Sequence, residues 1–317
     1  MTSWDLGPVT RVAARSYGRH MSQEHTTSPP TIVGIDGSPN AAAAVRWAQT
    51  LAPSLGPVEL VACWDYPLVG FATGAFGAGP LPMKDEMHAA ATEGARTFMA
   101  DQGFDVPLRV IHGDAGMTLC GQAERAAVLV VDTRGRGPIR ANLAGSVSRW
   151  CADHSPAPLV IVPDHHEIGS PSLDQVVVGV DGSPTSMAAL RWAAETFPDA
   201  DLTAVASWQT PIDGPMLFGA ERFDVTVFRA NARAIVEEAA DKVSADLGLT
   251  PERIGRRILE GDPRWTLLHE QDRADLLVVG RRGRAGLSHV LLGSTTTSLI
   301  HQPRCPIAVI PVVEDEA

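Results

Sequence analysis

Lysine is almost missing from the sequence: of its 26 basic residues, only Lys84 and Lys242 are lysines. Neither stands in a GxxxxGK[ST] pattern, so a P-loop of the Walker type is excluded. Acidic residues outnumber basic ones by 37 to 26, which gives a formal net charge of -11. A nucleic-acid-binding protein normally carries a basic face, so this balance argues against nucleic acid as a partner.

Cysteines are few as well, and the four of them form no C-x-x-C pair. This scatter argues against a zinc site or a disulfide framework and predicts buried free thiols. No apolar run reaches the length of about 18 residues that a membrane span needs. The first 20 residues also lack the apolar segment of a signal peptide. We therefore expect a cytoplasmic protein with no membrane partner.

The N-terminal residues 1–30 are polar, show no hydrophobic periodicity and end in Ser-Pro-Pro. This composition predicts a disordered tail. Met21 opens a segment that would also serve as a natural start, so the first 20 residues are a candidate extension.

The rest of the chain is a repeat. TIVGIDGSPNAAAAVRWA, which begins at Thr31, matches VVVGVDGSPTSMAALRWA, which begins at Val176, and three later segments match in the same order. A period this long exceeds any solenoid repeat, so a whole domain is duplicated. We predict one domain over 31–163, a polar linker over 164–173 that contains His165 and His166, and a second domain over 174–313.

Each half alternates short apolar strands with Ala-rich helical stretches. In the second half we expect strands near 175–181, 201–208, 254–260, 275–280 and 307–312. Runs rich in Val and Ile are typical of strands covered on both faces. The alternation predicts two tandem, doubly wound, parallel five-stranded sheets, each a Rossmann-like α/β/α sandwich with right-handed crossovers.

A glycine-rich segment follows the predicted fourth strand of the second half. Ligands of such sheets bind beyond the carboxyl ends of the strands, where Asp181 and Gly280 would both lie if the first and fourth strands are neighbours. Gly280 and Gly283 would permit positive φ and close backbone approach. Gly293 precedes a predicted helix, whose first N–H groups attract anions. The segment therefore favours a phosphate site over a simple tight turn with a capped helix, although glycines alone would leave that alternative open.

These features together resemble universal stress protein domains, and the chain resembles a tandem member of that family. The motif of the ATP-binding members, G-x2-G-x9-G-[ST], is complete from Gly280 through Gly283 to Gly293 and Ser294. The similarity covers nearly the whole chain beyond residue 30. It implies an adenine nucleotide alpha hydrolase-like fold.

The resemblance also implies a ligand and its contacts. In that family the first-strand aspartate contacts the nucleoside, the end of the second strand contacts adenine, and the glycine loop contacts ribose and phosphates. ATP, with Mg²⁺, would accordingly bind at Gly179, Asp181, Ser207, Gly280, Arg281, Arg282, Gly283, Arg284, Ala285, Gly286, Gly293, Ser294 and Thr295.

The first half departs from the motif at one position. It keeps Gly34, Asp36, Gly135, Gly145 and Ser146, but Asp132 replaces the first glycine. Like charges about 4 Å apart, at an effective dielectric constant of about 20, repel by about 4 kcal/mol. We therefore predict that the second half binds ATP and that the first binds it weakly or not at all. The alternative, in which Asp132 points into solvent and its site still works, stays open.

Other recurring residues have structural interpretations. Ser38 and Ser183, each followed by proline, are predicted helix N-caps. Trp47 and Trp192 recur in the first helix of each half and are expected in the core. For Asp36 and Asp181, turn stabilisation is the alternative to ligand contact.

The resulting prediction is an ATP-binding stress-response regulator that is not an enzyme. The sequence shows no Walker lysine, no carboxylate pair in the loop and no Ser-His-Asp spacing, and His289 stands in an apolar run. A nucleotide-independent scaffold and a slow ATP hydrolase remain the alternatives. The family resemblance further implies that two edge strands, LVIVP (159–163) and IAVIPVV (307–313), pair antiparallel inside the chain. A homodimer in addition to this pairing is possible, and the protein partners stay unknown.

Overall fold

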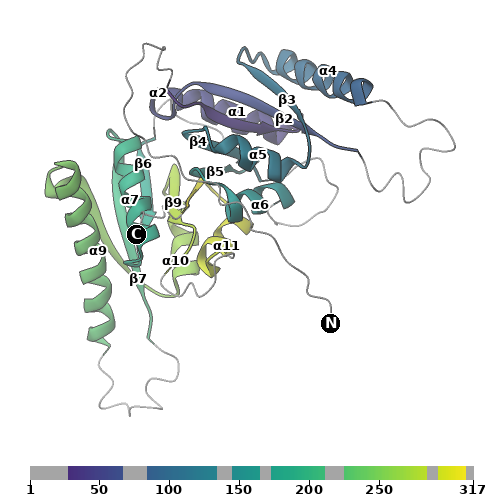
Figure 1. Ribbon diagram of the computed structural model, residues 1–317. Helices are drawn as coiled ribbons and strands as arrows, with labels where there is room; N and C mark the ends of the chain where they lie inside the picture. The colour runs from purple at the N-terminus through teal and green to yellow at the C-terminus, as the bar shows by residue number, and fades with distance from the viewer. Residues whose placement is uncertain are drawn as a thin grey trace, which may run out of the picture.

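The computed structural model describes residues 28–66, 84–133, 145–164, 173–210, 225–283 and 292–311. The predicted N-terminal tail up to residue 27, the linker histidines His165 and His166, and His289 lie outside these ranges. Figure 1 shows the order of the elements along the chain.

The first half alternates strands and helices as its apolar pattern predicts. Its elements are β1 (Thr31–Ile35), α1 (Pro39–Thr50), α2 (Ala52–Leu55), β2 (Val58–Trp64), α4 (Lys84–Gln102), β3 (Leu108–His112), α5 (Ala115–Ala123), β4 (Val128–Asp132), α6 (Ser146–His154) and β5 (Leu159–Val162).

The second half repeats this order. Its elements are β6 (Gln175–Gly179), α7 (Pro184–Thr196), β7 (Asp201–Trp208), α9 (Thr226–Leu247), the 3₁₀ turn η1 (Pro251–Arg253), β8 (Ile254–Glu260), α10 (Pro263–Glu270), β9 (Leu276–Gly280), α11 (Ser294–His301) and β10 (Ile307–Ile310).

The strands of both halves form one sheet. Its order is β3-β2-β1-β4-β5-β10-β9-β6-β7-β8, and every pairing is parallel except that of β5 with β10. In that antiparallel pair Ile307 lies opposite Ile161 and Val309 opposite Leu159. The expected pairing inside the chain therefore merges the two predicted five-stranded sheets into a single ten-stranded sheet, in which neither β5 nor β10 is an exposed edge.

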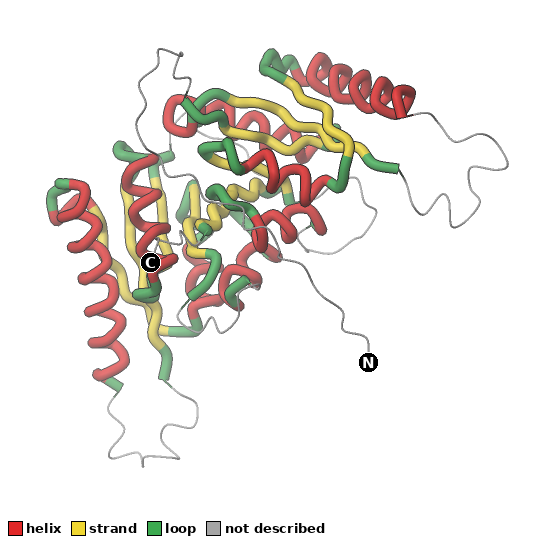
Figure 2. Tube along the Cα trace, viewed as in Figure 1, coloured by secondary structure: helices red, strands yellow, loops and turns green. Residues whose placement is uncertain are grey.

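Two apolar layers cover the sheet, one on each face. The helices that lie over the strands are drawn in red in Figure 2. Alternation along each strand divides the side chains between them: Val128 and Val130 join the layer under α1, α4, α7 and α9, while Leu129 and Val131 join the layer under α5, α6, α10 and α11. Each layer contains buried residues of both halves. The fold is thus the α/β/α sandwich that the sequence predicts, with a core that continues through the junction.

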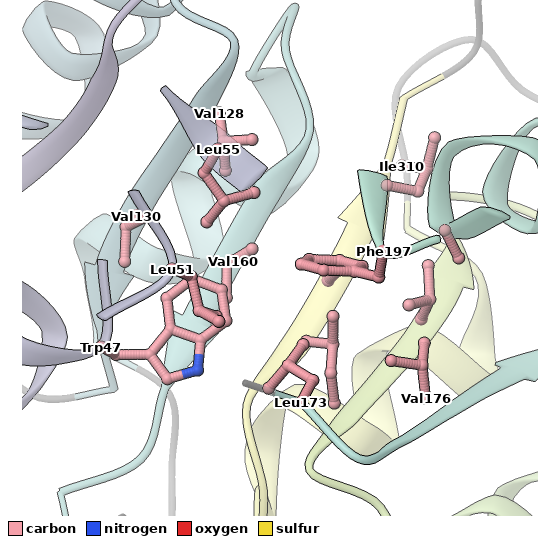
Figure 3. Close-up of a cluster of buried hydrophobic side chains, with 14 of the residues drawn as sticks. Trp47, Leu51, Leu55, Val128, Val130, Val160, Leu173, Val176, Phe197 and Ile310 are labelled. Atoms are coloured by element: carbon pink, nitrogen blue, oxygen red, sulfur yellow. The ribbon is translucent and has the colours of Figure 1, made fainter. Parts of the chain in front are cut away.

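Figure 3 shows part of the first layer, where Trp47 packs with residues of the first half and Phe197 with residues of the second. The Trp47 side chain is fully buried, and Trp192 packs edge-on against Phe197 with ring centroids 5.6 Å apart. The prediction that the repeated tryptophans belong to the core is confirmed for Trp47, whereas Trp192 is partly buried and packs against the core from its edge.

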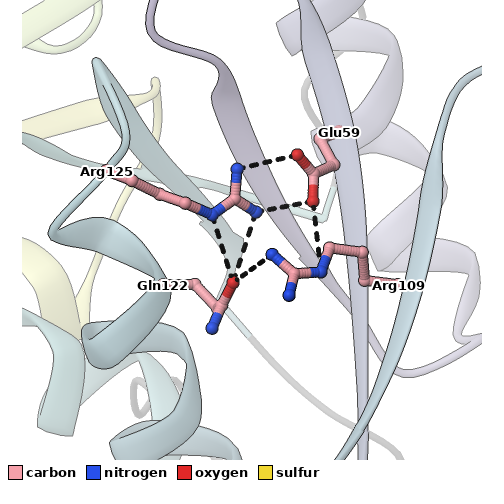
Figure 4. A network of polar contacts seen from close by, with 4 residues as sticks. All are labelled: Glu59, Arg109, Gln122 and Arg125. Atoms are coloured by element: carbon pink, nitrogen blue, oxygen red, sulfur yellow. Dashed lines mark hydrogen bonds and ion pairs between the residues drawn. The ribbon is translucent and has the colours of Figure 1, made fainter.

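The outer part of the first half is held by a polar network on the sheet face (Figure 4). Arg125 donates two hydrogen bonds to the Glu59 carboxylate, at 2.8 and 2.5 Å, and Arg109 lies 3.7 Å from the same group. Gln122 accepts from both arginines. The network ties β2 and β3 to the end of α5, beside the outer strand of the sheet.

The helices that begin with Ser-Pro start as predicted. The Ser38 hydroxyl accepts a hydrogen bond from the Ala41 amide, and the Ser183 hydroxyl accepts one from the Ser186 amide, each at 3.2 Å. In both helices the proline occupies the first turn, where its missing N–H costs nothing.

Among the helices that the structure describes, none combines the length and the apolar character required to cross a membrane.

Candidate functional site

A cavity of about 680 Å³ opens at the carboxyl ends of β6, β7 and β9 in the second half. This volume lies within the range of about 300–1,000 Å³ that is usual for small-molecule sites. The sheet order places β6 beside β9, so the first and fourth strands of this half are neighbours at the switch point, as the sequence argument requires. The cavity is lined by these predicted site residues: Gly179, Asp181, Ser207, Gly280, Arg282, Gly283, Gly293, Ser294 and Thr295.

The glycine loop is held close to the start of α7. The Thr185 hydroxyl donates to the Arg282 carbonyl, and a Cβ placed on Gly280 would lie only 2.8 Å from the Thr185 Cβ. A Cβ on Gly283 would lie 2.5 Å from Oδ2 of Asp181. Neither glycine has a positive φ, so the expectation of left-handed backbone was wrong. These positions need glycine because the loop packs against neighbouring atoms without space for a side chain.

Gly179 has a related packing role. A Cβ on Gly179 would meet a methyl group of Leu267 at 2.9 Å, and a Cβ on Gly34 would meet the matching Leu119 at 2.7 Å. Gly34 and Gly179 thus let α5 and α10, the helices after the third strand of each half, pack close to the first strand. Gly179 also lines the cavity, whereas its neighbour Asp181 uses Oδ1 to accept the Ser183 amide at 3.0 Å.

The N-terminus of α11 faces the cavity with free donors. Gly293 occupies the N-cap position, and no side chain caps the helix. The first hydrogen bond back to the cap comes from Thr297, at 2.9 Å, so the amides of Ser294, Thr295 and Thr296 precede the intrahelical ladder. These three residues all line the cavity. Such a helix start offers N–H donors and a partial positive charge to an anion.

The two arginines of the loop point to different places. Arg282 lines the cavity, and its buried Nε has no hydrogen-bond partner among the residues that the structure describes. Arg281 instead donates to the carbonyl of Ser155 in the first half. Burial, and next the charge of Arg282, lower the pKa of Arg281 from its ordinary value. Of the predicted loop arginines that the structure describes, Arg282 lines the cavity and Arg281 does not.

Further residues line the cavity that the motif does not identify. One wall consists of Phe228, Asn231 and Ile235 of α9, and Trp208 and Gln209 lie at the end of β7. The signal for Trp208 and Gln209 is their place directly after Ser207, at the end of a predicted strand. The sequence gives no comparable signal for the α9 face, because the apolar spacing of a helix does not say which residues reach past the sheet edge.

Some predicted residues cannot be placed. Arg284, Ala285 and Gly286 of the second half and Gly135 of the first lie outside the described residues. Within the described parts of the chain, no group of three or more His, Cys, Asp or Glu side chains is arranged to hold a metal ion.

The corresponding strand end of the first half carries a carboxyl group, that of Asp132. Oδ2 of Asp132 accepts a hydrogen bond from the Ser38 hydroxyl at 3.2 Å. Burial, and next the nearby Asp36 carboxylate, raise the pKa of Asp132 to about 7. The side chain thus turns toward Ser38 and Asp36 rather than into open solvent. Gly145 and Ser146 keep their predicted places at the start of α6, where Gly145 caps the helix.

Aromatic and imidazole rings gather beyond β2 of the first half. The Trp64 indole donates to Nδ1 of His88 at 3.2 Å, and its ring lies 4.5 Å from that of His112. Tyr66 approaches Trp64 edge-on at 5.9 Å. Trp208, which ends the matching strand of the second half, lines the cavity instead.

Comparisons with known proteins agree with the duplicated architecture. The universal stress protein family matches residues 30–163 and again residues 173–311. A universal stress protein of Mycolicibacterium smegmatis is 29% identical over 293 residues, which cover 88% of this chain and 96% of the relative. The crystal structure of a universal stress protein from Archaeoglobus fulgidus is 18% identical and covers 90% of this chain and 98% of its own, with a TM-score of 0.59.

A shorter structure with a bound nucleotide also matches. It is a universal stress protein family protein from Arabidopsis thaliana with AMP bound, 21% identical, which covers 45% of this chain and 94% of its own with a TM-score of 0.32.

Proposed function

The chain belongs to the universal stress protein family, as a member with two tandem domains, and from that premise we propose that it is a stress-response regulator that binds ATP in its second half. The observation that carries the proposal is the cavity beyond β6 and β9, where the uncapped start of α11 and the packed glycine loop meet. Occupancy of this site would set the conformation that protein partners meet.

Three features of the cavity fit a polyphosphate. The amides at the start of α11 are donors without helical acceptors, and the Arg282 Nε is buried without a partner. Gly280 and Gly283 hold the loop where a Cβ would collide with Thr185 or Asp181. Among the described lining residues, Asp181 is the one that carries a carboxylate. Mg²⁺ would therefore be coordinated mainly by the phosphate oxygens of the nucleotide.

The remaining walls fit a nucleoside. Phe228, Ile235 and Leu267 supply apolar surface, and Ser207 and Gln209 supply polar groups at the strand end. This mixture of an apolar lining with a few placed polar groups is typical of small-molecule sites.

We propose one nucleotide per chain. Asp132 of the first half presents a carboxyl group where the second half has Gly280, and its charge would oppose a phosphate. The end of β2 also differs from the end of β7, because Trp64 packs against His88 and His112 whereas Trp208 lines the cavity.

We further propose binding without rapid turnover, in the cytoplasm. Phosphoryl transfer requires a positioned base or water-orienting group and metal ligands. The acidic side chain that lines the described cavity, Asp181, already accepts the Ser183 amide. Slow ATP hydrolysis would require only a water molecule bound beside the terminal phosphate. A measurement of the rate of phosphate release therefore decides between a regulator and a slow hydrolase.

Isothermal titration of the full chain with Mg-ATP tests the proposal. We expect a stoichiometry of one and stabilisation against thermal unfolding, which reaches about 2.7 kcal/mol at 100 times the Kd. Arg282→Gln removes a charge-assisted donor from the cavity and should weaken ATP binding by roughly 10- to 150-fold, since such a bond contributes about 1.5–3 kcal/mol.

Arg304→Gln is the matched control. Arg304 belongs to the same half but pairs with Asp272 at 2.9 Å, on the exposed surface. This variant should bind ATP as the native chain does. Absence of any ATP effect on the native chain would favour the nucleotide-independent scaffold, and two equivalent sites would contradict the assignment to the second half.

A further inference from the structure

The close packing of α5 against α6 brings two cysteines together. A Cβ on Gly116 would lie 2.7 Å from the Trp150 ring, so only a glycine lets the two helices approach this far. Cys151 is fully buried on α6, and its thiol donates weakly to the Gly116 carbonyl at 4.0 Å. Cys120, one turn further along α5, packs against the same buried cluster that contains Cys151. Both are free thiols, and Cys120 is only half-buried, which corrects the expectation that all four would be buried.

The two thiols have different environments. The hydrogen bond from Cys151 is the main cause that lowers the pKa of Cys120, and the positive charge of Arg281 acts in the same direction. The same hydrogen bond, and then burial, raise the pKa of Cys151. One sulfur is therefore the better thiolate and the other keeps its proton, which is the usual arrangement of an attacking and a resolving cysteine.

The helix that carries Cys151 also contacts the glycine loop of the second half. Oδ1 of Asp153 accepts the Leu292 amide at 3.0 Å, immediately before the N-cap Gly293. The Ser155 carbonyl, at the C-cap of α6, accepts from the Arg281 guanidinium. The end of α6 thus holds both sides of the loop that borders the cavity.

We propose that Cys120 and Cys151 form a peroxide-oxidised dithiol whose disulfide changes the contacts of α6 with the glycine loop of the second half. The proposed site is one of covalent modification, separate from the cavity. Its formation does not require that the cavity bind ATP.

The reaction needs a hydroperoxide as oxidant. The Cys120 thiolate attacks one peroxide oxygen, so that an S–O bond forms, the O–O bond breaks, and the leaving hydroxide or alkoxide takes up a proton. The Cys151 sulfur then attacks the sulfenic acid sulfur of Cys120. An S–S bond forms, the S–O bond breaks, and hydroxide leaves with the thiol proton as water. Two thiols lose two electrons in total, and the peroxide is reduced.

The mechanical consequence follows from the bond length. A disulfide joins its sulfurs at about 2.0 Å, which is closer than two unbonded thiols approach, so its formation changes the packing of α6 against α5. Asp153 and Ser155 lie at the end of the same helix, so we expect their contacts with the second half to change as well. We expect the Leu292 amide to lose its acceptor and the loop to lose its support on that side.

The test treats the full chain with stoichiometric hydrogen peroxide and follows thiols by mass spectrometry. We expect two of the four thiols to disappear and a Cys120–Cys151 cross-link to appear in the peptide map. Cys151→Ser should leave a sulfenic acid at Cys120 that dimedone traps, and Cys120→Ser should slow thiol loss by at least about tenfold.

Cys63→Ser is the matched control, because Cys63 belongs to the same half. Burial, and next the charge of Asp114, raise the pKa of Cys63 to about 11, so it should remain a thiol and its loss should change nothing. A cross-link through Cys63, or dimedone on Cys63 or Cys305 in place of Cys120, overturns the assignment.

Hydrogen–deuterium exchange tests the coupling without any nucleotide. Peptides that cover residues 292–296 should exchange several-fold faster in the oxidised chain than in the reduced chain. Unchanged exchange there, in a chain whose disulfide has formed, overturns the proposed effect on the loop.

Discussion

The fourth strand ends in Asp132 in the first half and in Gly280 in the second. Because of this difference, the matching serines Ser38 and Ser183 have different hydrogen-bond partners. In the second half the Ser183 hydroxyl lies 3.1 Å from that of Thr185, which in turn holds the Arg282 carbonyl of the loop. In the first half the matching Ser38 donates to Asp132. Gly280 lets the loop pack against Thr185 at the start of α7. Asp132 instead accepts a hydrogen bond from the Ser38 hydroxyl.

The same contrast continues along the sheet. Trp208 ends its strand beside a cavity, but Trp64 ends its strand among His88, His112 and Tyr66. The N-caps, the packing glycines Gly34 and Gly179, and the buried strands are shared. Both copies thus keep the residues that the fold requires, whereas the matching strand ends differ at Asp132 and Gly280.

The strongest way to break the contrast is to place the first-half residue in the second half. Gly280→Asp adds a Cβ within 2.8 Å of Thr185 and a carboxylate beside the proposed phosphate position. We expect ATP binding to weaken by at least about 100-fold, since steric displacement and charge repulsion act together. Isothermal titration measures the loss.

Gly280→Ala separates the two causes, because it adds the Cβ without the charge. If the alanine and aspartate variants lose the same affinity, packing alone explains the effect. An aspartate variant that folds and binds ATP like the native chain would contradict the proposed site.

An effect on stability rather than on binding is expected when the first-half charge is removed. Because the pKa of Asp132 is raised to about 7 from an ordinary 3.8, the folded state holds its proton more tightly than the unfolded state. The associated stability is present at low pH and is lost as the pH rises through about 7. Asp132→Asn should therefore raise the free energy of unfolding by up to about 4 kcal/mol at pH 8 and change it little at pH 4.

Urea unfolding between pH 4 and pH 8 checks this pH dependence. Asp105→Asn, a substitution at an exposed aspartate of the same half, serves as the control for the loss of one carboxylate. An Asp132→Asn effect of equal size at both ends of the range would show that Asp132 is not the titrating group.

The smallest expected effect concerns the shared helix starts. Ser38→Ala and Ser183→Ala each remove the acceptor of an N-cap hydrogen bond and should cost about 1 kcal/mol of stability. Only Ser38→Ala should also raise the pKa of Asp132 further, because the Ser38 hydroxyl lowers it. Unfolding midpoints of both variants at pH 5 and pH 8 compare the two; a stronger pH dependence in the Ser183 variant would contradict this assignment.

Much of the fold was predictable because its signals are local. Buried parallel strands such as Leu276–Gly280 are continuous apolar runs, and the Ser-Pro pairs mark the helix starts. The neighbouring strands of the switch point follow from the repeat of strand and helix. The cavity therefore lies where Asp181 and Gly280 predict it.

The rest depends on tertiary geometry. Arg281 and Arg282 are adjacent and chemically identical, yet Arg281 donates to the C-cap carbonyl of α6 in the first half and Arg282 lines the cavity. The glycine loop has no positive φ at Gly280, and only the distance to Thr185 explains why glycine stands there. No local pattern in the sequence contains these distances.

The antiparallel pair of β5 and β10 has a consequence for how such a chain can diverge. Two identical subunits joined by a twofold axis must carry every substitution twice, so a change that spoils one site spoils both. Here the partners are covalently linked and encoded separately, and the shared sheet continues from one to the other. One copy is thereby free to change its chemistry while the other keeps its own, and the pair can never be assembled in the wrong ratio.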